Sequence, residues 1–327
     1  MTQPAGGWHD HTMTSSSSKP CIILDCDPGH DDAVAIVVAA YTCELLGITT
    51  VAGNAPLDRT THNARVLRHM LDLDVEVHSG AGRPVVVEPA FAGYVHGESG
   101  LDGADLPEPT RPVDGTDGIQ FLVETARSNP GCHLVATGPM TNIALALRSD
   151  PTLINHIAGI SFMGGGTFGN RTAMSEFNFW ADPHAAAVVV NSGLPLIMAG
   201  LDVTHQFQAT APRIEQVKSI EGQLAHVLSG LFEFFSANYS SRHYDMEGAA
   251  VHDPLAVLAL SHPQLFESEE RFVDVVIDGD HTRGMTVVDQ RTLIDRPAAN
   301  CTVLTKVDAD AAWHVAAAAI AAGSVER

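Results

Sequence analysis

The stretch CIILDCDPGHDDAVAIVVAAYT, residues 21–42, gives the strongest indication of the fold class. It opens with a short apolar run at 21–27, which is typical of a buried strand. Residues 31–42 then have the apolar spacing and the length of a helix. Only Pro28, Gly29 and His30 separate the two, so the stretch predicts a buried strand that turns directly into a helix.

The same alternation of strand and helix continues to residue 200. Further strands are expected at 45–53, 75–80, 133–138, 157–166 and 194–200, and further helices at 59–71, 116–128, 139–149 and 182–193. Strands separated by helices of this length form βαβ units, which build a parallel sheet covered by helices on both faces. Open sheets of this kind bind their ligands at the carboxyl ends of the strands.

Beyond residue 205 the pattern changes to longer helices. They are expected within 211–220, 222–244 and 252–261, followed by a hairpin of 271–278 with 284–291 and a terminal helix. No change of composition separates the two halves. We expect one α/β domain over 20–327, an open and mainly parallel sheet flanked by helices with a helical carboxyl-terminal part and a small β-hairpin. Residues 1–19 are expected to be a disordered tail.

Composition limits the partners. The chain has 327 residues, of which 45% are apolar, enough for a large core. Eighteen basic residues against 39 acidic ones give a net charge of -21. Such a field repels nucleic acid and anionic membranes. With three lysines and no basic run, the chain is also a poor candidate for phosphate-rich ligands. We therefore expect a small-molecule substrate, no nucleic acid and no membrane partner.

The cellular location is expected to be the cytoplasm. No segment approaches the roughly 20 consecutive apolar residues of a membrane helix. The amino end lacks the basic-then-apolar pattern of a secretory signal. The five cysteines are odd in number and show no C-x-x-C spacing, which favours buried reduced thiols.

Acidic residues crowd the junction between the first strand and the first helix. Four carboxylates, those of Asp25, Asp27, Asp31 and Asp32, fall within eight residues. Helix capping would satisfy one or two of them. It leaves Asp27 and its neighbour unexplained, whereas a hard divalent cation, Ca²⁺ or Mg²⁺, explains the whole set.

Three other places offer polar groups, each with a structural alternative. His252 and Asp253 precede a predicted helix and could be a simple cap. Thr137 ends a predicted strand and could offer its carbonyl to a metal. The stretch 170–178 contains amides and a carboxylate that suit a polyhydroxylated ligand, although turn chemistry explains them equally well.

The glycines at 164–169 match G-x-G-x-x-G. That dinucleotide-binding fingerprint requires a helix opening at its last glycine. Residues 170–183 are loop-like instead, so we reject a dinucleotide fold and interpret the glycines as room for a ligand or a tight turn.

Eight segments together resemble the signatures of the nucleoside hydrolases, in particular the inosine-uridine preferring type. They are DCDPGHDDA (25–33), VAGN (51–54), VHGESG (95–100), ATGPMTNIA (136–144), FMGGG (162–166), EFNFWADP (176–183), VHDP (251–254) and RGMTVVD (283–289). They occur in the family's order and span nearly the whole chain after residue 20. The combination is specific, although no single segment is.

The resemblance implies a Rossmann-like nucleoside hydrolase fold with Ca²⁺ at the carboxyl ends of the strands. The metal ligands it implies are Asp27, Asp32, Asp253 and the main-chain carbonyl of Thr137. Ribose-binding or sugar-pocket roles are implied for Asp31, Asn54, Met163, Asn170, Glu176, Phe177 and Asn178. The catalytic residues it implies are Asp27, His252 and His96, and no role is assigned to Tyr239, Arg242 or Tyr244.

The implied activity is Ca²⁺-dependent hydrolysis of the N-glycosidic bond of ribonucleosides to ribose and free base. A metal-held water activated by Asp27 would attack through an oxocarbenium-like transition state, which carboxylates favour. His252 would assist departure of the base, and His96 corresponds to the second histidine of this type. The resemblance also implies a homodimer or homotetramer and leaves the choice between purine and pyrimidine bases open.

Two alternatives stay open. A haloacid-dehalogenase-like phosphatase shares the Asp25-x-Asp27 pattern, but Gly29 stands where that family has Thr or Val, and lysines are scarce. A catalytically silent nucleoside- or sugar-binding protein could dispense with Asp27 or His252. Both residues are present, which favours an enzyme.

Overall fold

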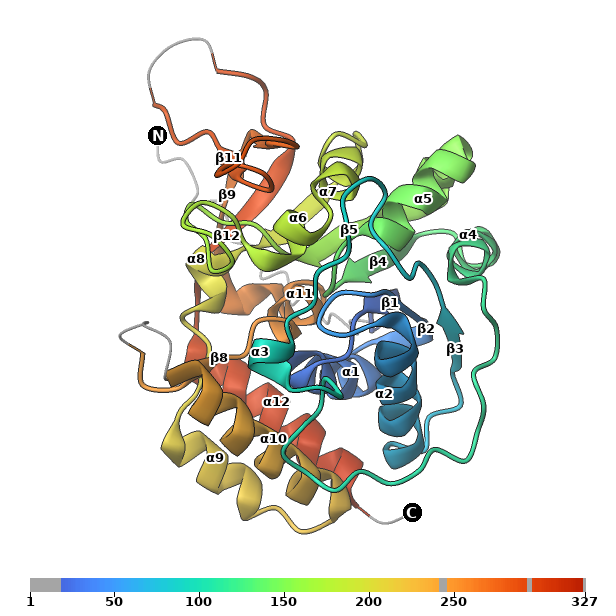
Figure 1. Ribbon diagram of the computed structural model, residues 1–327, viewed down its shortest axis with the longest axis vertical. Coiled ribbons are helices and arrows are strands. Elements are labelled where there is room, and N and C mark those ends of the chain that lie inside the picture. The colour runs from blue at the N-terminus through green and yellow to red at the C-terminus, as the bar shows by residue number, and fades with distance from the viewer. Residues whose placement is uncertain (1–18, 241–245, 293–295, 326–327) are drawn as a thin grey trace, which may run out of the picture.

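The centre of the computed structural model is an eight-stranded sheet with the order β3-β2-β1-β4-β5-β6-β12-β9 (Figure 1). The structure describes residues 19–240, 246–292 and 296–325. The strands are β1 Cys21–Cys26, β2 Glu44–Thr50, β3 Glu76–Ser79, β4 Cys132–Ala136, β5 Ile157–Met163, β6 Leu196–Ala199, β9 Phe266–Arg271 and β12 Cys301–Val307. Every neighbouring pair is parallel except β12 with β9. The mainly parallel sheet is confirmed.

Helices cover both faces of this sheet. The main ones are α1 His30–Thr42, α2 Leu57–Met70, α4 Gly118–Ser128, α5 Thr141–Ser149, α7 Pro183–Val190, α9 Ala211–Lys218, α10 Gln223–Ser240, α11 Pro254–Ser261 and α12 Ala309–Ser324. The shorter ones are α3 Gly93–His96, α6 Phe177–Ala181 and α8 Leu201–Thr204, with 3-10 turns at Pro151–Asn155 and Pro263–Leu265. Helices α4, α5 and α7 pack on one face, and α1, α11 and α12 on the other (Figure 1).

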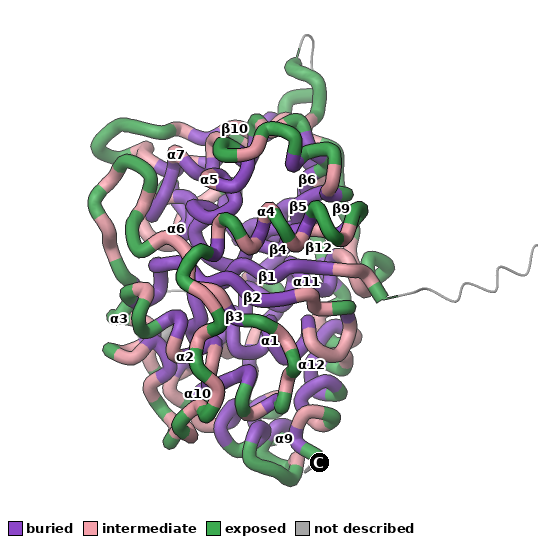
Figure 2. Tube along the Cα trace, turned by 90° about the vertical axis from the view of Figure 1, so that its right-hand side faces the viewer, coloured by how far each residue is buried: buried purple, intermediate pink, exposed green. Residues whose placement is uncertain are grey.

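The position of strand β1 explains why its sequence is mostly apolar. Ile22 and Leu24 belong to the core beneath α1, and Ile23 belongs to the core beneath α5. A strand buried on both faces is apolar at most positions, and the one charged residue of β1, Asp25, accepts hydrogen bonds from Thr49 and Asn142. The central strands β1, β4 and β5 accordingly run through the buried interior (Figure 2).

Two small sheets lie outside the main one. Strands β10 Val273–Val275 and β11 Thr286–Val288 pair antiparallel, which confirms the predicted hairpin in a shorter form. Strands β7 Gln208–Ala209 and β8 Ala249–Ala250 form a second antiparallel pair that the sequence analysis did not predict.

Three elements correct the sequence analysis. The loop-like reading of 170–183 is wrong at α6, where the Glu176 carboxylate accepts the N–H groups of Asn178 and Phe179 and so begins a short helix. Strands β9 and β12 were missed. Most of β9 is exposed and charged, FESEER, because it is the edge of the sheet, where charges oppose pairing with another chain.

Two expectations fall on residues that the structure does not describe. Residues 1–18 of the predicted tail and the unassigned Arg242 and Tyr244 lie outside the described ranges. Among the described residues, none of the helices combines the length and the apolar character needed to cross a bilayer.

The parallel register brings the ends of three strands together. Asp25 of β1 pairs with Ala136 of β4, which pairs with Phe162 of β5. The residues that follow each strand therefore meet at one edge of the sheet. The first turn of α1 also lies there, because α1 begins at His30 shortly after β1 ends at Cys26. The backbone N–H of Gly29 donates to Asp32 Oδ2 at 2.9 Å and holds this turn.

Candidate active site

A cavity of about 280 Å³ opens at this edge of the sheet. That is near the lower end of the roughly 300–1,000 Å³ of small-ligand sites. The predicted residues that line it are Asp31, Asn54, His96, Thr137, Met163, Asn170, Glu176, Phe177, Asn178, His252 and Asp253. Residues that are distant in the sequence thus share one small cavity. Asp27 and Asp32, the remaining predicted residues, lie beneath its lining.

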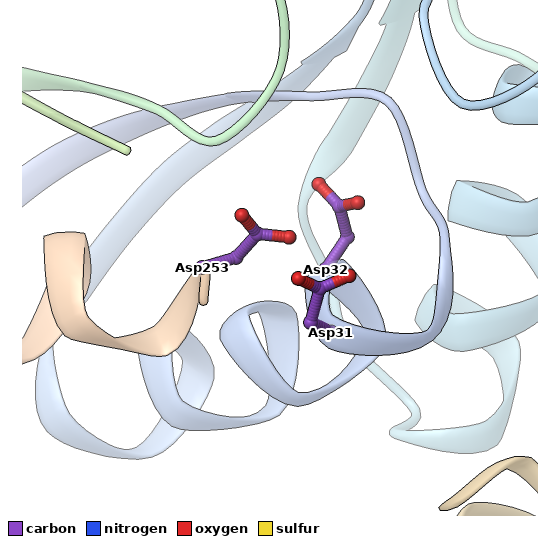
Figure 3. A group of neighbouring side chains, drawn as sticks. All are labelled: Asp31, Asp32 and Asp253. Carbon is purple, nitrogen blue, oxygen red and sulfur yellow. The ribbon is translucent and has the colours of Figure 1, made fainter. Parts of the chain in front are cut away.

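Three carboxylates converge at the floor of the cavity. Asp31 and Asp32 come from the first turn of α1, and Asp253 from the start of α11 (Figure 3). One oxygen of each lies within 4.8 Å of the others, so the group could hold a metal ion. Burial and the neighbouring carboxylates raise the pKa of Asp31 to about 7 and that of Asp253 well above its usual range. A bound cation would remove this cost.

The structure tests whether Asp32 and Asp253 act as helix caps. Asp32 does cap the turn, since it accepts the backbone N–H groups of Gly29 and Asp27. Asp253, by contrast, makes no capping hydrogen bond to the described part of α11. Capping therefore explains Asp32 but not Asp253.

One carboxylate oxygen of Asp27 has no hydrogen-bond partner among the described residues. Its Oδ2 accepts the backbone N–H of Asn54 at 2.6 Å. Its Oδ1 is buried and has no hydrogen-bond partner in the ranges that the structure describes. A Cβ on Gly53 or Gly138 would lie 2.1 or 2.4 Å from this carboxylate, so both positions require glycine. An unsatisfied buried carboxylate oxygen beside three more carboxylates fits a hard divalent cation.

Thr137 links the buried carboxylates to the amide side chain of Asn178. Its hydroxyl donates to Asp32 Oδ1 at 2.7 Å, and its carbonyl accepts the side-chain N–H of Asn178 at 2.8 Å. A carbonyl oxygen has two lone pairs, so one acceptor position remains for another ligand.

Asn170 and Glu176, which line the cavity, also accept hydrogen bonds from the nearby backbone. Asn170 Oδ1 accepts the backbone N–H of Phe177. Glu176 accepts three backbone N–H groups, including that of Gly165, and burial raises its pKa to about 7. The turn-chemistry alternative is therefore correct for these residues as well, and their contacts hold them rigidly against the cavity.

Two histidines face the cavity from opposite parts of the chain. His252 Nδ1 lies 2.8 Å from the hydroxyl of Thr204, and burial next to His205 lowers the pKa of His252 to about 3. His96 lies on α3, and its Nδ1 is 2.9 Å from Nδ1 of His30. Burial lowers the pKa of His96 well below its usual value.

Four lining residues were not predicted from the sequence. They are Ala92, Tyr94, Val95 and Phe235. The first three belong to the segment that carries His96, and the exposed Tyr94 could have been noticed there as an aromatic side chain beside a candidate histidine. Phe235 gives no local signal, because an aromatic residue in a long amphipathic helix is usually part of the core.

Comparison with known proteins identifies the chain. The profile of the family described as inosine-uridine preferring nucleoside hydrolase matches residues 22–314. The chain belongs to this family. It is a nucleoside hydrolase, as its motifs indicated, and this membership disfavours the phosphatase alternative.

Relatives of this nucleoside hydrolase match over most of their length. The pyrimidine-specific ribonucleoside hydrolase RihA of Enterobacter sp. (strain 638) is 42% identical over 292 residues, 88% of this chain and 93% of that protein. RihA of Escherichia coli (strain K12) is also 42% identical, over 88% of this chain and 94% of that protein.

Solved structures confirm the fold of this nucleoside hydrolase. The purine-preferring ribonucleoside hydrolase from Gardnerella vaginalis has a TM-score of 0.86 at 30% identity and covers 93% of this chain and 98% of that one. A plant nucleoside hydrolase, PpNRh1, has a TM-score of 0.84 at 27% identity over 93% of this chain and 99% of that one.

Proposed function

We propose that the protein hydrolyses the N-glycosidic bond of ribonucleosides, pyrimidine nucleosides in preference to purine nucleosides, with Ca²⁺ as its cofactor. The observation that carries the proposal is the convergence of Asp31, Asp32 and Asp253 beside the unsatisfied Oδ1 of Asp27. Oxygen ligands from two distant parts of the chain would form the cation site, and one of them, Asp27, would also be the general base.

The residues that would hold the ion are Asp27, Asp32, Asp253 and the carbonyl of Thr137. Ca²⁺ prefers six to eight oxygen ligands in flexible geometry, so it would leave positions for oxygens of water and sugar. When bound, it would neutralise the carboxylates and order those oxygens. Mg²⁺ demands a stricter octahedron and is the weaker candidate.

Asp27 would act as the general base. Its Oδ1 is buried and free of hydrogen bonds within the described chain, so it can accept a proton from a water held beside it. As positive charge grows on the ribose, the acidic wall, including Asp31 and Glu176, would stabilise it.

Two amides would position the sugar. Asn54 is fixed because its side-chain N–H donates to the carbonyl of Asp27 at 3.1 Å. Asn178 is fixed by its bond to the carbonyl of Thr137. Side chains held in this way lose little entropy when they meet a hydroxyl group, which favours one orientation of the ribose.

The preference for pyrimidine bases rests on the relatives. Proteins that are 42–43% identical to this chain are named pyrimidine-specific, whereas structures with purine or inosine-guanosine names are 27–30% identical. A panel of uridine, cytidine, inosine, guanosine and adenosine, assayed for released ribose, tests the proposal. We expect uridine and cytidine to have the highest kcat/KM. Equal or greater values for purines would reject the preference, and no ribose from any nucleoside would favour the silent binding protein.

Replacing His252 by alanine should cripple the cleavage of uridine. Its low pKa means that the ring is neutral, yet a neutral imidazole can still donate an N–H to a base on which charge builds. Loss of such a donor costs about 10²–10⁴ in rate. Nitrophenyl riboside, whose leaving group needs no proton, should be cleaved nearly as well as by the wild type.

The comparison of these two substrates separates chemistry from structure. If His252 were only a structural residue, both activities and the melting temperature would fall together. Equal losses on the two substrates would therefore remove His252 from the role of donor to the base.

A further inference from the structure

His96 has a buried partner that the reaction described above does not use. His30, the first residue of α1, lies with its Nδ1 2.9 Å from Nδ1 of His96, although 66 residues separate them. The other ring nitrogen of His30, Nε2, is 2.9 Å from the backbone carbonyl of Asp102. A chain of polar contacts therefore runs from Asp102 through His30 to His96 at the cavity wall.

The carbonyl at one end determines where the protons lie. A carbonyl oxygen can only accept, so Nε2 of His30 must carry the hydrogen that lies between them. In a neutral ring Nδ1 then has a lone pair, and the proton between the two histidines belongs to Nδ1 of His96. Both residues are buried, with 1% of His30 and 6% of His96 exposed, and such burial disfavours a charged ring, so we take both rings to be neutral.

The remaining nitrogen of His96 follows from this assignment. With Nδ1 protonated, Nε2 of the neutral ring has a lone pair and can only accept. Nε2 makes no hydrogen bond to any described residue, and the His96 side chain lines the cavity. It therefore presents an acceptor to whatever base occupies the cavity.

One contact opposes this arrangement. The backbone N–H of His30 also points at Nδ1 of His96, at 3.3 Å. It would favour the opposite tautomer, with the lone pair on Nδ1 and the proton on Nε2. The ring-to-ring contact, at 2.9 Å, is shorter than this 3.3 Å contact, and we take it to dominate. The His30 side chain, and not its backbone, thus decides what His96 offers.

The surroundings hold the His30 ring rigidly. Phe234 and Phe235 of α10 stack nearly parallel to it, at interplanar angles of 3° and 10°. The Asp102 carboxylate accepts the backbone N–H groups of Glu98 and Ser99 and so fixes the turn that carries its own carbonyl.

Glycine at position 29 permits the close approach of His96. A Cβ there would lie 2.8 Å from Nδ1 of that ring.

We propose that His30 is a positioning residue that holds His96 in the tautomer whose Nε2 accepts a hydrogen bond from an N–H of the substrate's base. The proposal rests on the proposed function, because it needs a nucleobase in this cavity. Uridine offers its N3–H and cytidine its exocyclic amino group. His96 then recognises the base and does not protonate it, which leaves that task to His252.

Two substitutions of His30 should move the tautomer in opposite directions. His30→Phe keeps the stack with Phe234 and Phe235 but removes the acceptor, so the backbone N–H of residue 30 should turn His96 to the Nε2–H tautomer. His30→Asn places an amide oxygen near the position of Nδ1, so it should keep the wild-type tautomer. Imidazole ¹⁵N spectra of the Ca²⁺-loaded protein distinguish the two forms, with His96→Gln to assign the signals.

Kinetics gives the second readout. Wild type and His30→Asn should prefer uridine over 3-methyluridine, which lacks the N–H, by a factor on the order of 10 to 100. In His30→Phe this ratio should fall by about tenfold, while nitrophenyl riboside is cleaved within a few-fold of the wild-type rate. The methyl group meets the same cavity in all three proteins, so the change in the ratio reports the hydrogen bond.

An Nε2–H tautomer of His96 in the wild type would overturn the proposal, and so would the same uridine preference in His30→Phe and wild type. A protein that cleaves no nucleoside would instead reject the proposed function, and the spectra would still decide the tautomer. Melting temperatures of both variants show whether either has lost its fold.

Discussion

Replacing Asp27 by asparagine should lower kcat/KM for uridine by at least about 10²–10⁴-fold, the usual contribution of a general base. The amide cannot take a proton from water, and it removes one of the negative ligands of the proposed cation site. The substitution preserves shape, because an amide oxygen can still accept the backbone N–H of Asn54. In the absence of metal the variant should be at least as stable as the wild type, since a buried charge has been removed.

Asp25→Asn is the matched control for this variant. Asp25 is buried two residues earlier, and its carboxylate accepts hydrogen bonds from Thr49 and Asn142 and does not line the cavity. Asp25→Asn should therefore lose no more than about tenfold in activity, which is a smaller loss than the roughly 10²–10⁴-fold expected when a general base is missing. Activity of Asp27→Asn at that same level would show that another group activates the water.

Exhaustive chelation should abolish hydrolysis and lower the melting temperature together. Burial raises the pKa values of Asp27, Asp31, Asp32 and Asp253, so keeping these groups ionised without a cation destabilises the folded protein. A ligand present at 100 times its Kd stabilises the folded state by about 2.7 kcal/mol. Added Ca²⁺ should restore both activity and melting temperature.

The comparison ion and a variant sharpen this test. Mg²⁺ should restore much less of either property, and equal restoration would reject the choice of Ca²⁺. In Asp253→Asn the Ca²⁺-dependent rise of the melting temperature should shrink, because one of the three converging carboxylates is lost. Full activity in protein verified to be free of metal would remove the cation site altogether.

Much of the fold could be read from local patterns. A parallel strand buried on both faces is apolar at most positions, and its crossover helix has its own period, so β1, α1 and their successors could be predicted from the sequence. β9 was missed because an exposed edge strand lacks that pattern. α6 was missed because a short helix is recognised by its cap, and Glu176 is an unusual residue for a cap.

The carboxylate-rich junction after β1 and, through eight segments in family order, the family of the protein could be predicted from residue types and their spacing. Which of these groups meet depends on tertiary packing. Asp253 lies more than 220 residues from Asp31, and only the packing of α11 against α1 brings its carboxylate to the others. The contact of His30 with His96 depends in the same way on the turn that Asp102 holds. Residue types and local spacing show which chemistry a single position can perform. The distances between positions far apart in the sequence are set by the packing of the sheet and its helices.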